Sequence, residues 1–184
     1  MELGLQGRVV SICGSGTSAL DACADLLVRE GAVIADASEA PADIVVAAGR
    51  RQPGSDLLAL DGVDDLYHAW DDVLNAVKSY RAALPRMLEN QWGRFVWIGT
   101  AQAKSVDAEQ DELSAIVSLG MLGLHKVVTG EVGRNNITAN AVLRGGQATD
   151  QDVADTVAFL CSVGAGYLSG VTISVDGGAG SAVY

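Results

Sequence analysis

Three hydroxyl side chains in the middle of the chain are spaced so that they could share one site. Thr100 follows an apolar run that predicts a buried strand, and Ser114 and Ser118 lie four residues apart in a predicted helix, 109–132. Residues i and i+4 lie on one helix face, so the two serines should point the same way. An unassisted serine hydroxyl is too weak an acid for proton transfer near neutral pH. We therefore expect no catalytic residue here, while Thr100 could hydrogen-bond a ligand or simply end its strand.

A glycine-rich turn, CGSGTSAL, separates the first predicted strand from the first predicted helix. In dinucleotide-binding proteins, such a turn lets a pyrophosphate approach the helix N-terminus. Gly14 and Gly16 alone are weak evidence for this function, and we favour a tight turn that holds no nucleotide. Asp36, after the second predicted strand, could hold ribose hydroxyls or be a solvated loop carboxylate.

Short apolar runs alternate with amphipathic segments along the chain, which predicts an α/β fold. The expected architecture is one domain, residues 1–184, with a Rossmann-like, doubly wound parallel sheet of about six strands. Residues 116–124 are apolar on nearly every side, so this helical segment should be buried against another helix or another subunit. Pro85 should bend the second helix. The expected strands are 8–12, 32–35, 43–48, 95–98, 137–142 and 172–175, and the expected helices are 18–30, 63–90, 109–132 and 150–162.

The composition narrows the possible partners. Twelve Lys and Arg against 23 Asp and Glu give a net charge of −11, which disfavours binding to nucleic acid or to an anionic membrane. Three cysteines without a C-x-x-C spacing are typical of reduced thiols, and no apolar run approaches 18 residues, so we expect a cytoplasmic protein. His68 and His125 have no obvious partners in the sequence, and we interpret both as structural or surface residues.

Three segments carry a resemblance to a known family. The sequences GRFVWI at 93–98, ITANAV at 137–142 and YLSGVTISVDGG at 167–178 resemble segments of the short-chain dehydrogenase/reductases. The resemblance covers nearly the whole chain. It implies that a helix–strand–helix unit is lost after the second strand, and that the family's substrate lid is lost after residue 142.

The same resemblance implies that the family's functional residues are replaced. The catalytic Tyr and Lys positions hold Ser114 and Ser118, and the substrate-binding Ser position holds Thr100. In the nucleotide turn, Ser18 and Leu20 stand where the family has glycines, and the Leu20 side chain should add bulk near the phosphates. Residues for shape and assembly persist, whereas those for chemistry do not.

The resemblance therefore implies a non-catalytic, structural subunit of a hetero-oligomeric NAD-dependent dehydrogenase. Its partner would be an intact short-chain dehydrogenase subunit that carries the NAD, in a heterotetramer. The complex would act on a hydroxyacyl-CoA, such as hydroxybenzylsuccinyl-CoA in anaerobic toluene degradation. This chain itself is expected to bind no cofactor and no metal. The expected subunit contacts are Leu119, Gly120, Gly123, Tyr167, Asp176, Gly177 and Gly178.

Two other functions stay open at this point. One is a nucleotide-binding enzyme with a different chemistry that uses Thr100, Ser114 or Asp36. The other is a homo-oligomeric sensor or scaffold with a vacant pocket. Nucleotide binding by the isolated chain distinguishes the first of these, and the native mass of the purified protein distinguishes the second.

Overall fold

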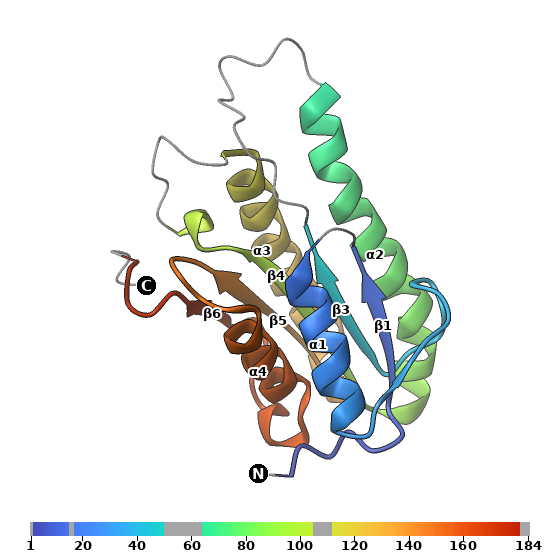
Figure 1. The fold of residues 1–184 in the computed structure, drawn as a ribbon. Helices are drawn as coiled ribbons and strands as arrows, with labels where there is room; N and C mark the ends of the chain where they lie inside the picture. Colours follow the sequence, from blue (N-terminus) through green and yellow to red (C-terminus); the bar gives the residue numbers. More distant parts are fainter. Residues whose placement is uncertain (1, 15–16, 50–63, 105–111, 181–184) are drawn as a thin grey trace.

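The computed structural model describes residues 2–14, 17–49, 64–104 and 112–180. Their core is one parallel sheet of six strands in the order β2-β1-β3-β4-β5-β6, with helices on both faces (Figure 1). This confirms the Rossmann-like, doubly wound fold that the alternating pattern predicts. The strands are β1 (Val9–Cys13), β2 (Val33–Ile34), β3 (Ile44–Ala48), β4 (Gly93–Thr100), β5 (Ile137–Arg144) and β6 (Thr172–Val175).

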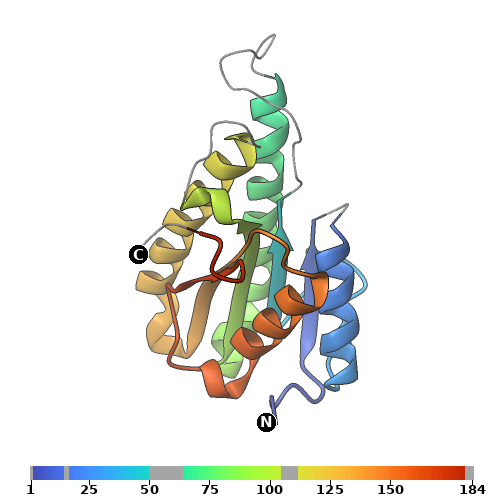
Figure 2. The ribbon, with the colours of Figure 1, turned by 60° about the vertical axis from the view of Figure 1, so that its left-hand side comes forward.

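Four α-helices cover the sheet in two layers. Helices α1 and α4 pack together on one face, and α2 and α3 pack together on the other (Figure 2). The central strands β3, β4 and β5 are buried along almost their whole length, as expected for strands covered on both faces. The helices are α1 (Ser18–Arg29), α2 (Asp64–Asn90), α3 (Glu112–Val132) and α4 (Asp150–Cys161).

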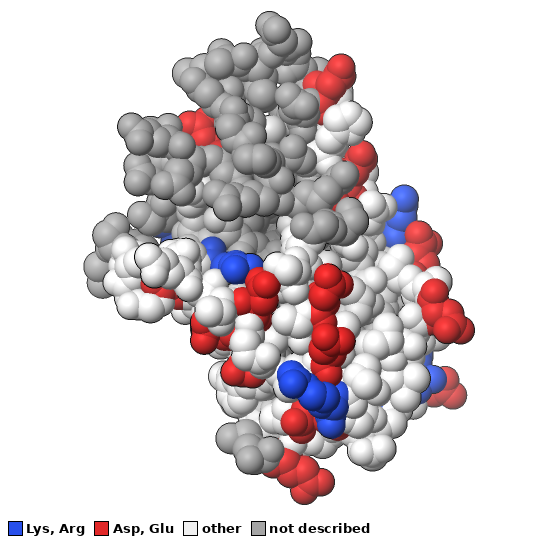
Figure 3. Space-filling model, in the orientation of Figure 1, with Lys and Arg blue, Asp and Glu red and all other residues white. Residues whose placement is uncertain are grey.

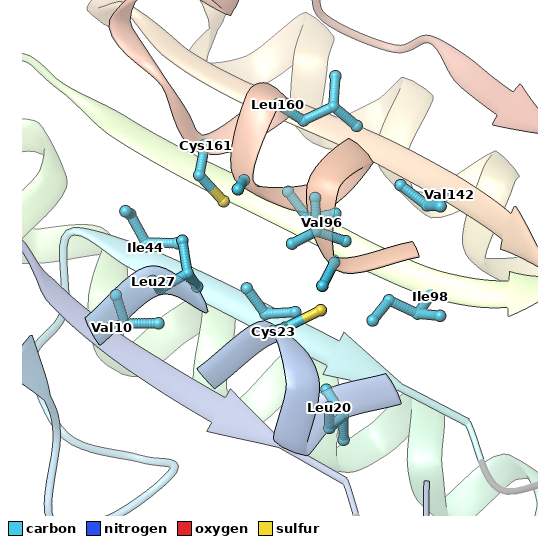
Figure 4. Packing of buried hydrophobic residues seen from close by; sticks show 14 of the residues in the cluster. Val10, Leu20, Cys23, Leu27, Ile44, Val96, Ile98, Val142, Leu160 and Cys161 are labelled. Carbon is cyan, nitrogen blue, oxygen red and sulfur yellow. The ribbon is translucent and has the colours of Figure 1, made fainter. Parts of the chain in front are cut away.

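Each helical layer has its own apolar core. Under α1 and α4, side chains such as Val10, Cys23, Leu27 and Leu160 meet between the helices and the sheet (Figure 4). Under α2 and α3, a second cluster contains several large aromatic and sulfur-containing side chains, among them Tyr80, Met87, Phe95, Trp97 and Met121. The sheet therefore separates two cores that differ in composition.

Two short connections shape the molecule. β2 has only two residues and lies at the edge of the sheet, and the chain returns from Ile34 to β3 at Ile44. β5 ends at Arg144 and α4 begins at Asp150, so no long segment lies between them. Both connections are thus short at the two places where the resemblance implies a loss.

Helix α2 continues through Pro85 and is not broken at the expected bend.

Helix α3 differs from the expectation that no apolar stretch is long enough to span a membrane. Within the described part of the chain, Glu112–Asn135 is long and apolar enough to cross a membrane by length and composition, with mean hydropathy 1.4. It lies along the sheet through Leu113, Val117 and Met121, but only 39% of its apolar window is buried. Much of this apolar helix is therefore on the surface.

Candidate functional site

Two of the three hydroxyl residues meet where β4 ends. Thr100 is the last residue of β4, and its backbone N–H donates to the Ser118 Oγ at 3.2 Å. The Thr100 Oγ1 accepts from the Gln102 N–H at 3.4 Å and so caps a short 3-10 helix. Ser118 comes from α3 and is only 2% exposed. Both hydroxyls therefore stabilise local backbone, which is the non-catalytic role that the sequence allows for Thr100.

A tryptophan fills the space beside Ser118. Trp97 is fully buried on the α2–α3 face of β4, and its Nε1 has no hydrogen-bond partner among the described residues. A Cβ placed on Gly99 would lie 2.7 Å from the Ser118 Oγ and 2.9 Å from the Trp97 Nε1. The other end of the indole lies 3.0 Å from where a Cβ on Gly49 would be. Ser118, which the resemblance places at the lysine position, thus has a small, buried side chain with close neighbours.

Ser114 lies one turn before Ser118 on α3. It is partly buried, whereas Ser118 is almost completely buried. The two serines share a helix face, as their spacing predicts, and Ser118 accepts the hydrogen bond from the Thr100 N–H. A proton-transfer pair needs two groups of suitable acidity within hydrogen-bond reach. Among the described residues, the Ser118 hydroxyl, the Thr100 backbone N–H and the Trp97 indole do not form such a pair.

The nucleotide turn is only partly described, because Gly16 lies outside the described residues. Gly14 has φ +126°, and a Cβ there would lie 2.6 Å from the Ala48 carbonyl oxygen, so this position requires glycine. Leu20 is buried in the α1–α4 core, with its Cδ1 directed at Gly14 (Figure 4). Its bulk therefore lies in the core beneath the turn. Asp36 is exposed in a bend after β2.

The structure gives His125 a partner that the sequence does not reveal. The Nε2 of His125 on α3 lies 2.8 Å from the Tyr80 Oη on α2, and both residues are buried. Burial lowers the pKa of His125 to about 4 and raises the pKa of Tyr80 above its ordinary value. His125 is therefore neutral at physiological pH and joins two helices. His68 is exposed, 3.6 Å from Asp71, which agrees with a surface role.

The outer face of α2 and α3 carries apolar side chains in the described residues. Leu119 and Val127 on α3, and Tyr67 and Leu74 on α2, are all exposed. A Cβ on Gly120 would lie 2.7 Å from the Trp70 ring of α2, so Gly120 lets the two helices approach. A Cβ on Gly123 would meet no described atom within 4 Å. We call the exposed residues Tyr67, Leu74, Leu119, Gly123 and Val127 the apolar face.

The C-terminal motif forms a turn after the edge strand β6. Asp176 accepts from the Gly178 N–H at 2.9 Å and from the Gly180 N–H at 3.2 Å. Gly177 and Gly178 have φ of +62° and +82°, a conformation that favours glycine. Tyr167, before this strand, is fully exposed. The Asp-Gly-Gly sequence thus has a local structural reason, and its place in a subunit interface remains a prediction.

No group of three or more His, Cys, Asp or Glu side chains that could hold a metal ion occurs among the described residues. The three cysteines are free and buried, and burial raises the pKa of each thiol. A buried thiol with a raised pKa is a weak nucleophile.

The comparisons with known proteins agree with this fold. No protein-family model matches the chain. The chain is similar to the 3-oxoacyl-(acyl-carrier-protein) reductase FabG of Pseudomonas aeruginosa, with 30% identity over 139 residues that cover 59% of this chain and 56% of the reductase. The chain thus spans about half the length of the reductases that it matches in sequence.

Solved structures extend the likeness to nearly the whole chain. A short-chain dehydrogenase/reductase from Serratia marcescens superimposes with a TM-score of 0.81 and 25% identity, covering 95% of this chain and 98% of that one. A blue fluorescent protein from a metagenomic library, in complex with NADPH, superimposes with a TM-score of 0.82 at 21% identity and the same coverage. The homologues and structural neighbours are short-chain dehydrogenase/reductases, and the chain has their Rossmann-like fold.

Proposed function

We propose that this chain is a non-catalytic subunit of a hetero-oligomeric short-chain dehydrogenase. Its partner is an intact subunit of the same family, which supplies the NAD and the catalytic residues. This chain contributes an interface that orders the partner's active site. The assembly is a heterotetramer, by analogy with the tetramers that the family resemblance implies.

The observation that carries the proposal is the arrangement at Ser118. The hydroxyl at the position of the catalytic lysine is buried and accepts a hydrogen bond from the Thr100 N–H. The indole of Trp97 fills the adjacent space. A cation that lowers the pKa of a neighbouring phenol is the usual source of proton transfer in this family, and neither group has a counterpart here.

The apolar face supports the assembly part of the proposal. It runs along two neighbouring helices, which approach where Gly120 meets Trp70. Exposed apolar side chains on two neighbouring helices support a protein interaction site on this face. In the family resemblance, the two equivalent long helices pair across subunits. A subunit with the same fold therefore presents a matching surface.

The substrate class follows by analogy only. Two relatives that match part of this chain are named as 3-oxoacyl-(acyl-carrier-protein) reductases. A hydroxyacyl-CoA is the reduced counterpart of such a substrate on a different thioester carrier. We propose that the complex oxidises a hydroxyacyl-CoA, for example hydroxybenzylsuccinyl-CoA in anaerobic toluene degradation, in the cytoplasm.

The test is co-expression with the dehydrogenase that is encoded beside this chain. We expect the two to co-purify, with NAD-dependent activity on a hydroxyacyl-CoA that the partner alone has at a much lower level. A native mass of two copies of each chain would match the proposal. A chain that is stable and monomeric alone, and that leaves the activity of the dehydrogenase unchanged, would refute it. A homo-oligomer of this chain alone would favour the scaffold function instead.

A further inference from the structure

Helices α2 and α3 lie side by side and run in the same direction along their face of the sheet (Figures 1 and 2). Trp70 of α2 lies against Gly120 of α3, and further along both helices the Tyr80 Oη lies 2.8 Å from the His125 Nε2. The N-terminal ends of the two helices are therefore at one end of the apolar face, and their C-terminal ends are at the other.

The outer stripe of α2 carries its charges in a fixed order. Tyr67, Asp71, Leu74, Lys78 and Arg81 recur every three or four residues, and all of them are exposed. This spacing places them on one side of the helix, which points away from the sheet. The acidic side chain comes before Leu74 along the helix, and the basic side chains come after it.

Helix α3 repeats this order. Glu112 begins the helix, and the outer stripe continues through the exposed Leu119 and Gly123. The exposed Lys126 follows, and the exposed Arg134 lies just beyond the end of the helix at Val132. Both helices therefore have acidic side chains toward the start, apolar positions in the middle and basic side chains toward the end.

The two ends of the apolar face thus differ in charge, although the chain as a whole has a net charge of −11. Residues 64–77 and 112–125, at the N-terminal end, contain no Lys or Arg. At the C-terminal end, the exposed basic side chains outnumber the exposed acidic ones: they are Lys78, Arg81, Lys126 and Arg134 against Glu89 and Glu131.

The helix macrodipole does not account for this order. Its effect on charged side chains falls off within the first and last turns of a helix. Asp71 and Lys78 lie well inside α2, and neither α2 nor α3 has a basic residue in its last turn. The charges are arranged around the apolar face instead, which is the arrangement of a rim that selects one orientation of a bound protein.

We propose that this charge order sets the orientation in which the dehydrogenase subunit binds the apolar face. The proposal rests on the proposed function, which supplies the partner. The partner's surface is apolar in the middle, acidic where it covers Lys78 and Lys126, and basic where it covers Asp71. Two helices with the same charge order, running antiparallel to α2 and α3, have this chemistry. The opposite orientation would bring like charges together at both ends.

The test compares two exposed residues on the same stripe of α2. Lys78→Glu and Asp71→Lys should each weaken binding of the full-length chain to the dehydrogenase by about fivefold at low ionic strength, because each replaces an attraction by a repulsion. Both effects should largely disappear in about 1 M sodium chloride. Calorimetry measures the affinities, and thermal unfolding verifies that each variant is folded.

The matched controls lie on the other helical layer. Arg29→Glu and Asp25→Lys make the same charge changes at exposed positions of α1, and they should change the affinity by less than about twofold. They separate an effect at the apolar face from an effect of total charge.

Three results would overturn the proposal. Tighter binding by Asp71→Lys together with weaker binding by Lys78→Glu would show that the partner is acidic at both ends. Equal effects at α2 and α1 would show that only total charge matters. A dimer of the isolated chain that both α2 variants weaken, while the complex is unaffected, would make a second copy the occupant. If the native chain does not bind the dehydrogenase at all, the proposed function itself fails, and the orientation fails with it.

Discussion

The two helical layers of this molecule have different outer surfaces. The α1–α4 layer presents acidic side chains to the solvent, among them the exposed Asp21, Asp25, Asp152 and Asp155. The face of the molecule drawn in Figure 3 carries many acidic side chains. The α2–α3 layer presents the apolar face. A charged surface is stable in water, whereas a contiguous apolar one is usually covered by another protein. We therefore expect the proposed partner to bind the α2–α3 layer, and this expectation can be tested one layer at a time.

The largest effect is expected from a charge on the apolar face. Leu119→Glu should abolish assembly with the dehydrogenase, because it would bury an unpaired carboxylate in the interface. The chain itself should remain folded, since Leu119 is 49% exposed. Its matched control is Val28→Glu on α1, where the native residue is also 49% exposed. Native mass spectrometry of both complexes measures the contrast, and equal loss of assembly by the two variants would contradict it.

The α1–α4 layer should depend on its own internal contacts. Arg94 is buried and donates to the carbonyl oxygens of Gly93, Asn136 and Ser162, the last at the C-terminal end of α4. Arg94→Met should lower the free energy of unfolding by about 3 kcal/mol, because these carbonyls lose charged donors. Arg8→Met provides a control, since Arg8 also stacks on Trp92 but is partly exposed. Urea unfolding midpoints compare the two, and similar losses would show that Arg94 acts only through Trp92.

The α2–α3 layer should be the more sensitive one to mild acid. His125 has a pKa of about 4 in the folded chain and about 6.5 when unfolded. The unfolded chain therefore binds a proton that the folded chain does not, and stability falls as the pH drops from 6.5 to 4, by up to about 3 kcal/mol. His125→Gln should flatten this part of the pH profile. If the pH dependence of stability were unchanged in His125→Gln, His125 would not be its cause.

A second loss of folding stability should appear at lower pH. Burial alone would raise the pKa of Asp43, but the hydrogen bonds from Arg86, Val9 and Asn90 and the Arg86 charge together lower it. The stability that this carboxylate contributes is present above its unfolded pKa and is lost as the pH falls through its folded pKa. This step therefore follows the one from His125, and Asp43→Asn should remove it.

Two glycines of α3 separate internal packing from assembly. Gly120→Leu should lower the free energy of unfolding by about 2 kcal/mol, because its side chain would collide with the Trp70 ring. Gly123→Leu should leave the isolated chain as stable or slightly more stable, since the position is open and glycine is a poor helix former. Only the second variant should impair assembly while leaving the thermal midpoint intact. A lower thermal unfolding midpoint for Gly123→Leu would show instead that residue 123 is packed inside the folded chain.

The sequence predicts the architecture well because its signals are local. Buried β-branched runs such as Ile44–Ala48 mark strands without any tertiary information. The apolar character of residues 116–124 likewise predicts a helix that packs against another helix or another subunit. Six strands follow from the number of such runs.

The details of the site could not be predicted because they depend on contacts between distant segments. The sequence predicts that Gly120 and Gly123 are both subunit contacts, and nothing local indicates that Gly120 faces Trp70 of α2 while Gly123 is open. The partnership of His125 with Tyr80 spans 45 positions. A residue pattern fixes which face of a helix a side chain occupies, but not what lies opposite it.

The most direct test of the account is the activity of the complex with all three hydroxyls removed. A complex that contains Thr100→Ala, Ser114→Ala and Ser118→Ala together should retain NAD-dependent oxidation of the hydroxyacyl-CoA within about twofold, because the chain supplies surface and not chemistry. Because the Ser118 Oγ accepts a hydrogen bond from the Thr100 N–H, the triple variant should lose about 1 kcal/mol of stability. Its assembly should therefore be verified by native mass. A fall in kcat of a hundredfold or more in a fully assembled complex would contradict the account.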